Sequence, residues 1–202
     1  MLHVPFQRDS EGGHKAGPTI VVSGSPGSGK STYARRLSID LGLKYYSSGE
    51  IFRAIARERG VSIVELSRMA ESDPSVDIEI ERKTLSIAEK GGVVIDSHLA
   101  AWILASTADM LVYVKAPLKV RAERLAARDG KSVAESYREI IAREESQAFR
   151  FAKYYGLDTR DLSIFHLILD TGAYSLEEAY SIIKLAVVKR LKSLGYILGE
   201  NI

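Results

Sequence analysis

Eight residues near the start of the chain have the types and the spacing of a phosphate-binding loop. They are Gly24, Ser25, Pro26, Gly27, Ser28, Gly29, Lys30 and Ser31, which match the pattern G-x-x-x-x-G-K-S. Glycines let the backbone turn tightly, so that consecutive N–H groups point at phosphate oxygens. Lys30 can then reach the β- and γ-phosphates, and the Ser31 hydroxyl can hold Mg²⁺.

The flanking residues supply the setting that this loop requires. An apolar, β-branched run at 19–22 precedes it, and a stretch of helical character at 32–37 follows it. A helix that begins at the loop adds the positive end of its dipole to the phosphate site. A plain glycine-rich turn does not need this strand–loop–helix setting, so the segment predicts a nucleoside triphosphate site.

An acidic residue, Asp96, ends a second apolar run at 93–96. In enzymes with such a loop, an acid in this place can bind Mg²⁺ directly or through water. A strand-end aspartate can equally cap the next helix. The sequence leaves both interpretations open.

Arginines at helical spacing form the second group of candidates. They are Arg121, Arg124, Arg128, Arg143 and Arg150. An isolated arginine row is usually a solvated helix face with pairs such as Glu139–Arg143. With a nucleotide site in the same domain we favour phosphate contacts, because the guanidinium fork suits phosphate oxygens and phosphoryl transfer needs positive charge. The first candidates are Arg128, Arg143 and Arg150, followed by Arg124.

A third segment, Ser48-Gly49 followed by Arg53, is a small polar turn that leads into a helix carrying arginine. By itself this is also the description of an ordinary helix start.

The elements that position these residues alternate along the chain. Apolar runs predict strands at 19–23, 44–46, 93–96, 110–114 and 167–170. Longer amphipathic stretches predict helices between them, and capping boxes begin at Ser62, Ser132 and Ser175. Strands separated by helices imply parallel pairing, hence a three-layer α/β sheet that binds ligands at the carboxyl ends of its strands. Helical excursions at about 47–90 and 129–160 suggest mobile subdomains around one core.

Composition narrows the class of protein. The 202 residues are enough for one domain, with ordinary hydrophobic (46%) and charged (27%) fractions. A net charge of +2 gives little reason to expect nucleic-acid binding, and the absence of cysteine rules out disulfides and thiolate metal sites. No apolar run is long enough to span a bilayer. We expect a disordered tail at 1–17, a single domain at 18–202, no membrane partner and a cytoplasmic location.

Taken together, the motifs resemble the nucleoside monophosphate kinases, and among them the archaeal-type cytidylate kinases. The resemblance runs from about residue 19 to 190. It is sharpest at 46–53, 99–102, 121–130 and 143–150. It implies a P-loop NTPase fold with a five-stranded parallel sheet of order 2-3-1-4-5, an NMP-binding insertion and a lid.

The same resemblance implies transfer of the ATP γ-phosphoryl group to CMP or dCMP, with Mg²⁺. Residues from Gly24 to Thr32 would then hold ATP, and Ser31 and Asp96 the metal. Ser48, Gly49 and Arg53 would contact the acceptor. Arg124 and Arg128 would approach the ATP phosphates or base, while Arg143 and Arg150 would close from the lid. The partners implied are small nucleotides, and we expect a monomer.

Two positions depart from the family pattern. Relatives commonly have Gly-Arg where this chain has Ser97-His98, and that arginine would bind the acceptor phosphate. A neutral His98 replaces at most one hydrogen bond, and losing a charge-assisted contact costs about tenfold to a hundredfold in affinity. Gln147 stands where an acid would accept from the cytosine amino group. Its amide can still accept, but it also donates, which softens discrimination against uracil.

Two alternatives follow from the residues. One is a kinase of another small acceptor, such as AMP, UMP or a hydroxyl substrate, for which Asp96 would take the proton. The other is a nucleotide-dependent binding protein in which transfer is vestigial.

Overall fold

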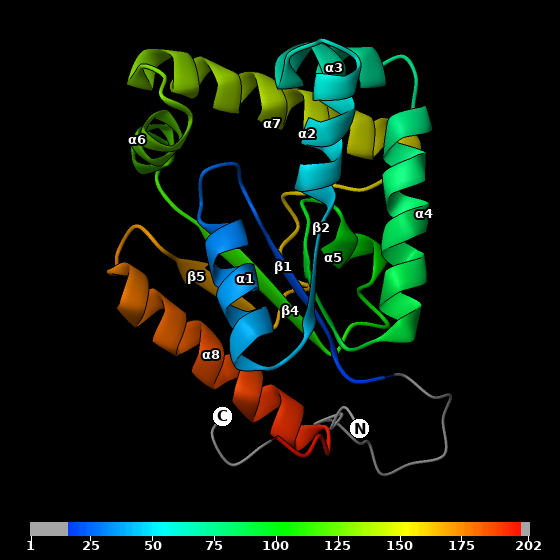
Figure 1. Ribbon diagram of the computed structural model, residues 1–202, viewed down its shortest axis with the longest axis vertical. Helices are drawn as coiled ribbons and strands as arrows, with labels where there is room; N and C mark the ends of the chain where they lie inside the picture. Colours follow the sequence, from blue (N-terminus) through cyan, green and yellow to red (C-terminus); the bar gives the residue numbers. More distant parts are fainter. Residues whose placement is uncertain (1–15, 199–202) are drawn as a thin grey trace.

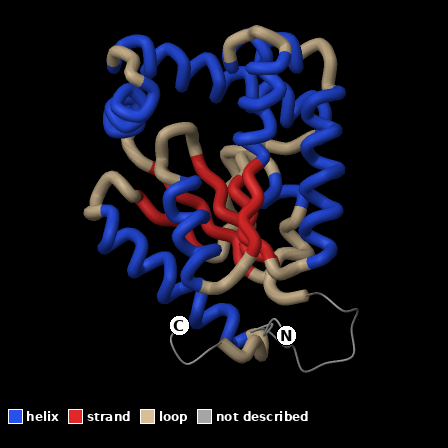
Figure 2. The backbone as a smooth tube through the Cα atoms, viewed as in Figure 1, coloured by secondary structure: helices blue, strands red, loops and turns tan. Residues whose placement is uncertain are grey.

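The computed structural model describes residues 16–198 and contains one five-stranded parallel sheet (Figures 1 and 2). Its order is β2-β3-β1-β4-β5, which confirms the predicted topology. The strands are β1 (Thr19–Gly24), β2 (Lys44–Ser47), β3 (Val93–Asp96), β4 (Met110–Lys115) and β5 (Leu167–Asp170). Each strand is joined to the next by helices, as parallel neighbours require.

The helices agree with the predicted ones within a few residues. They are α1 (Lys30–Asp40), α2 (Ser48–Glu58), α3 (Ile63–Ala70), α4 (Ser75–Lys90), α5 (Ala100–Ile103), α6 (Leu118–Asp129), α7 (Val133–Tyr155) and α8 (Leu176–Ser193). All three predicted capping boxes are formed, at Ser62, Ser132 and Ser175. The single-turn α5 has no counterpart among the predicted elements. Helix α7 ends at Tyr155, because the left-handed Gly156 follows it.

The core lies on both faces of the sheet, which makes three layers. On β1, Ile20 and Val22 pack into a cluster with α1 and α8, while Val21 between them packs into the opposite cluster, beside Ile95. All six residues of β1 are buried, as in a central parallel strand that is covered on both sides.

Two helical segments extend beyond the carboxyl ends of the strands (Figure 1). Helices α2, α3 and α4 lie within the predicted insertion at about 47–90, called the insertion below, and have a small apolar core of their own around Leu66 and Ile80. Helix α7, which follows α6, lies within the predicted lid at about 129–160 and is called the lid below. Lid and insertion touch, since the Ser146 hydroxyl donates to the Ser67 carbonyl (3.0 Å) and the Tyr154 hydroxyl to the Glu71 carbonyl (2.6 Å). The cleft described below is therefore framed by elements that are far apart in sequence.

Of the predicted tail at 1–17, residues 1–15 lie outside the described part of the chain. The backbone N–H of Ala16 donates to the Lys90 carbonyl (2.8 Å). Between residues 16 and 198, the helices are too short or too polar to cross a membrane.

Candidate active site

The loop between β1 and α1 is held by close backbone packing. A side chain at Gly24, where φ is 145°, would place its Cβ 1.9 Å from the Val114 carbonyl oxygen. At Gly27, with φ 79°, the Cβ would lie 2.6 Å from the Arg121 carbonyl oxygen. Both positions therefore require glycine. The loop leads directly into α1 at Lys30, so the N-terminal end of that helix faces the cleft.

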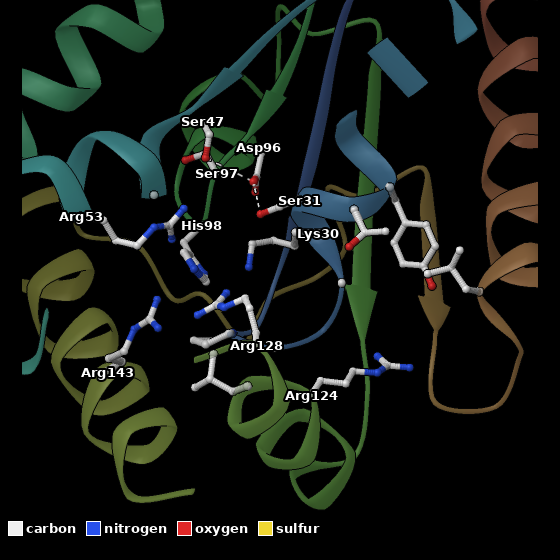
Figure 3. A pocket seen from close by; sticks show the side chains of 18 residues that line it. Lys30, Ser31, Ser47, Arg53, Asp96, Ser97, His98, Arg124, Arg128 and Arg143 are labelled. Atoms are coloured by element: carbon white, nitrogen blue, oxygen red, sulfur yellow. Dashed lines mark hydrogen bonds between the residues drawn. The ribbon is translucent and has the colours of Figure 1, made fainter. Parts of the chain in front are cut away.

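A cleft of about 450 Å³ lies at the carboxyl end of the sheet (Figure 3). It brings together most of the predicted site residues: Pro26, Gly27, Gly29, Lys30, Ser31, Thr32, Gly49, Arg53, Asp96, His98, Arg124, Arg128 and Arg143. The loop, the insertion and the lid thus contribute to one space. This is the arrangement that transfer between two bound molecules requires.

Six predicted residues lie outside the walls of this main cleft. Ser28 is fully buried, and Gly24 and Ser25 line another hollow beside the loop. Ser48, Gln147 and Arg150 line a second, narrower cleft next to the first.

The carboxylate of Asp96 faces the loop. Its Oδ2 accepts hydrogen bonds from the hydroxyls of Ser31 (2.5 Å), Tyr45 (3.0 Å) and Ser47 (3.3 Å). The side chain that caps the next turn is Ser97, whose Oγ accepts from the backbone N–H groups of Leu99 and Ala100. Of the two interpretations left open by the sequence, the helix cap is therefore wrong.

Positive charge concentrates around Lys30, which is 7% exposed. Its Nζ donates to the Ser25 carbonyl (3.2 Å). Burial lowers the pKa of Lys30 to about 7, opposed by Asp96 and assisted by Arg143, Arg53 and Arg128. Figure 3 shows these three arginines and Lys30 pointing into the same space. Such a cluster favours a ligand that carries several negative charges.

His98 lies among the same cations. Burial, followed by the charges of Lys30 and Arg143, lowers its pKa well below the ordinary value. At neutral pH its imidazole is therefore uncharged, and it offers one donor and one acceptor.

Each of the cleft-lining arginines of α6 and α7 has an anchor. Arg124 donates to the hydroxyl (3.0 Å) and the carbonyl (2.9 Å) of Thr171, which follows β5. Arg128 pairs with Asp129 at 2.7 Å, and Arg143 pairs with Glu139 at 3.3 Å. These contacts aim the guanidinium groups without neutralising the cluster as a whole.

Arg150 departs from the predicted placement. Its side chain forms a buried ion pair with Asp77 of α4 and lies outside the main cleft. The pairing with α4 turns it toward the second cleft, because the acid that neutralises it is on the insertion and not at the loop. Arg150 therefore does not line the main cleft, where we expected it to contact phosphate.

Several residues that line the main cleft are not among the predicted site residues. They are Tyr33, Ser47, Ser97, Leu125 and Leu176. Tyr33 and Leu176 stand in the first turns of α1 and α8, and nothing in their types distinguishes them from core residues. Ser47 had a usable signal, since a small polar residue at a strand end before a helix is a preferred cap.

A family profile and the curated relatives that match this chain both refer to cytidylate kinase. Residues 19–173 match the profile of the "Cytidylate kinase-like family". A protein of Aeropyrum pernix named cytidylate kinase is 58% identical over 163 residues, which cover 81% of this chain and 95% of that protein. Another of the same name, from Staphylothermus marinus, is 50% identical over 173 residues, with 86% and 98% covered.

Solved structures support the fold at lower identity. A shikimate kinase from Bacteroides thetaiotaomicron aligns with a TM-score of 0.54 at 16% identity, covering 88% of this chain and 98% of that one. A gluconokinase from Sinorhizobium meliloti gives 0.53 at 15% identity, covering 88% and 95%. At this level of identity the likeness concerns the fold alone.

Proposed function

The chain belongs to the cytidylate kinase-like family, and from this premise we propose how its residues transfer a phosphoryl group from ATP to CMP or dCMP. It is an ATP-dependent nucleoside monophosphate kinase acting on cytidylate, and the products are ADP and the diphosphate. The observation that carries the assignment of residues is the main cleft, where the loop, Asp96 and arginines from both helical segments meet.

The loop from Gly24 to Thr32 binds the donor. Its backbone N–H groups and the start of α1 face the phosphates, and Lys30 neutralises the β- and γ-oxygens. Arg124, held by Thr171, approaches ATP on the side of the β5–α8 connection.

The same site suits Mg²⁺. Ser31 and Asp96 place a hydroxyl and a carboxylate oxygen 2.5 Å apart beside the loop. Among the described residues, His, Cys, Asp and Glu form no cluster of three or more that could hold a metal. Magnesium bound mainly through substrate phosphates needs no such cluster, because it keeps several waters and takes one or two protein ligands. When bound, the ion would offset charge on the phosphate oxygens.

The acceptor phosphate binds where α2 meets the end of β3. Ser48 and Gly49 begin α2, Arg53 reaches the main cleft from it, and His98 lies opposite. Arg53 supplies positive charge at this end of the cleft, whereas His98 is uncharged at neutral pH.

Transfer requires no general base in this arrangement. The second pKa of a phosphate monoester is about 6, so the acceptor is already a dianionic nucleophile at neutral pH. Lys30, Arg128 and Arg143 then act by positioning the two phosphates and by stabilising the charge of the transition state. Closure of the lid and the insertion over both substrates excludes water, which would otherwise take the γ-phosphoryl group. We further propose that the protein acts as a monomer.

A panel of acceptors tests the assignment. ADP production is measured with Mg·ATP and, separately, CMP, dCMP, UMP, AMP and GMP. We expect kcat/KM to be highest for CMP and dCMP. Turnover confined to AMP or UMP would keep the reaction and overturn the base. ATP binding without turnover of any monophosphate would favour a nucleotide-dependent binding protein.

A further inference from the structure

The second cleft opens beside the acceptor end of the main cleft. The two share Gly49, Arg53, Ser97, His98 and Arg143. Beyond these residues the second cleft is lined by Asp77 and Glu81 of α4 and by Arg150 of α7. On the proposed function, a molecule whose phosphate lies at Arg53 extends its other end into this space.

Buried polar atoms without partners concentrate around this cleft. Among the described residues, five buried side-chain N or O atoms have no hydrogen-bond partner, and three of them are Glu81 Oε2, Arg150 Nε and the Tyr155 hydroxyl. Glu81 is 8% exposed and Arg150 is 2% exposed. Buried polar groups are almost always hydrogen-bonded, so such a cluster indicates a missing polar ligand.

The charges do not cancel within the protein. Arg150 is paired with Asp77 and Arg143 with Glu139, whereas no cation is paired with Glu81 in the described structure. Burial and the neighbouring Asp77 raise the pKa of Glu81 to about 8, so that this carboxyl group holds a proton at neutral pH in the free protein. Burial, followed by the charges of Glu81 and Asp77, raises the pKa of Tyr155. A ligand N–H group that donates to Glu81 favours the carboxylate, so binding of such a ligand would release this proton.

Two aromatic rings also line the second cleft. Phe52 of α2 and Phe151 of α7 line the cleft, and their ring centroids lie 5.7 Å and 5.6 Å from the Arg150 guanidinium carbon. Aromatic faces bind bases by stacking, and polar groups between them read the edge of the base.

We propose that Glu81 and Arg150 read the edge of the acceptor base, with Glu81 accepting from the exocyclic amino group of cytosine and Arg150 Nε–H donating to the ring N3 or the O2. This inference rests on the proposed function and deepens it by naming the residues that select the base. Uracil places a carbonyl oxygen where cytosine has its amino group, so it would face the carboxylate with an acceptor. It also presents N3–H to the Arg150 donor.

In this proposal the acid that reads the base is Glu81. The family pattern has an acid at position 147, where this chain has Gln147. Glu81 lines the same cleft from the insertion. Gln147 is only partly buried and lines the rim of two hollows.

Glu81→Gln is the direct test, because the amide keeps the shape but can donate to the uracil O4. We measure kcat/KM for CMP and for UMP in wild type, Glu81→Gln, the competing candidate Gln147→Ala and the matched control Glu79→Gln, whose exposed side chain lies on the same helix. The CMP-to-UMP ratio should fall about tenfold to a hundredfold in Glu81→Gln, the effect of one charge-assisted hydrogen bond. It should stay within about threefold of wild type in Glu79→Gln, as for other exposed positions. In Gln147→Ala it should fall much less than in Glu81→Gln. The KM for ATP should be unchanged in all three variants.

The possible results distinguish failure of the base-reading assignment from failure of the proposed kinase function. A wild-type CMP-to-UMP ratio in Glu81→Gln, with ATP binding and thermal unfolding intact, would overturn the inference and leave the kinase assignment standing. A lower CMP-to-UMP ratio in Gln147→Ala alone would assign the reading of the base to Gln147, and would also overturn the inference. If the wild type does not phosphorylate CMP, the proposed function itself fails.

Discussion

At the scale of single residues, the proposed chemistry depends on Lys30, whose pKa burial lowers to about 7. Lys30 is buried at the start of α1 beside three arginines, and Asp96 only partly offsets their charges. Bound phosphates would supply the anions that this surrounding lacks. Nucleotide binding and protonation of Lys30 should therefore be coupled.

This coupling gives a pH dependence of known sign. The pKa of Lys30 in the free protein is about 7, and bound phosphates raise it. Above pH 7 binding must take up a proton, so ATP affinity should fall as pH rises, by up to about tenfold per unit between pH 7.5 and 9. Titration of Mg·ATP binding at several pH values measures this slope. In Lys30→Ala the affinity should be weaker and the slope lost, while an equal slope in both proteins would refute the coupling.

At the scale of elements, helix α7 contributes an arginine to the main cleft, and we propose that the lid acts through this residue. Helix α7 has Arg143 on the face toward the cleft and Arg138 on its exposed face. Its capping box at Ser132 fixes where the helix begins, and thereby which residues of α7 face inward.

Removing the inward arginine should slow the chemical step. In Arg143→Ala we expect the rate of transfer in a single turnover to fall by about a thousandfold, the lower range for arginines that stabilise transferring phosphoryl groups. The matched variant Arg138→Ala should keep nearly the full rate. If the two variants lose activity equally, Arg143 acts through the helix and not at the phosphates.

At the scale of the whole molecule, the strands and helix starts were predictable from local patterns, and the family resemblance implied the sheet order. The strand Val93–Asp96 is apolar up to its final aspartate, and the three capping boxes mark helix starts by local chemistry that tertiary packing did not override. The loop residues were predictable because phosphate binding needs glycine, lysine and serine at fixed spacing.

The residues of the second cleft were not predictable in the same way. Glu81 reads as one of several acids on an amphipathic helix, and only the fold shows that it is buried without a donor. Arg150 was a candidate because it is an arginine, but its partner Asp77 lies 73 positions away in sequence. No local pattern relates such distant residues, so their pairing required the packed structure.

The central claim is direct transfer of a phosphoryl group between two nucleotides in the main cleft, and labelled transfer measures it. The protein is incubated with ATP labelled at the γ-phosphate, Mg²⁺ and CMP, and the products are separated. We predict that the label appears in CDP with little free phosphate, and that Lys30→Ala, still folded, nearly abolishes this transfer. Label released only as inorganic phosphate, or near-wild-type transfer by Lys30→Ala, would contradict the account.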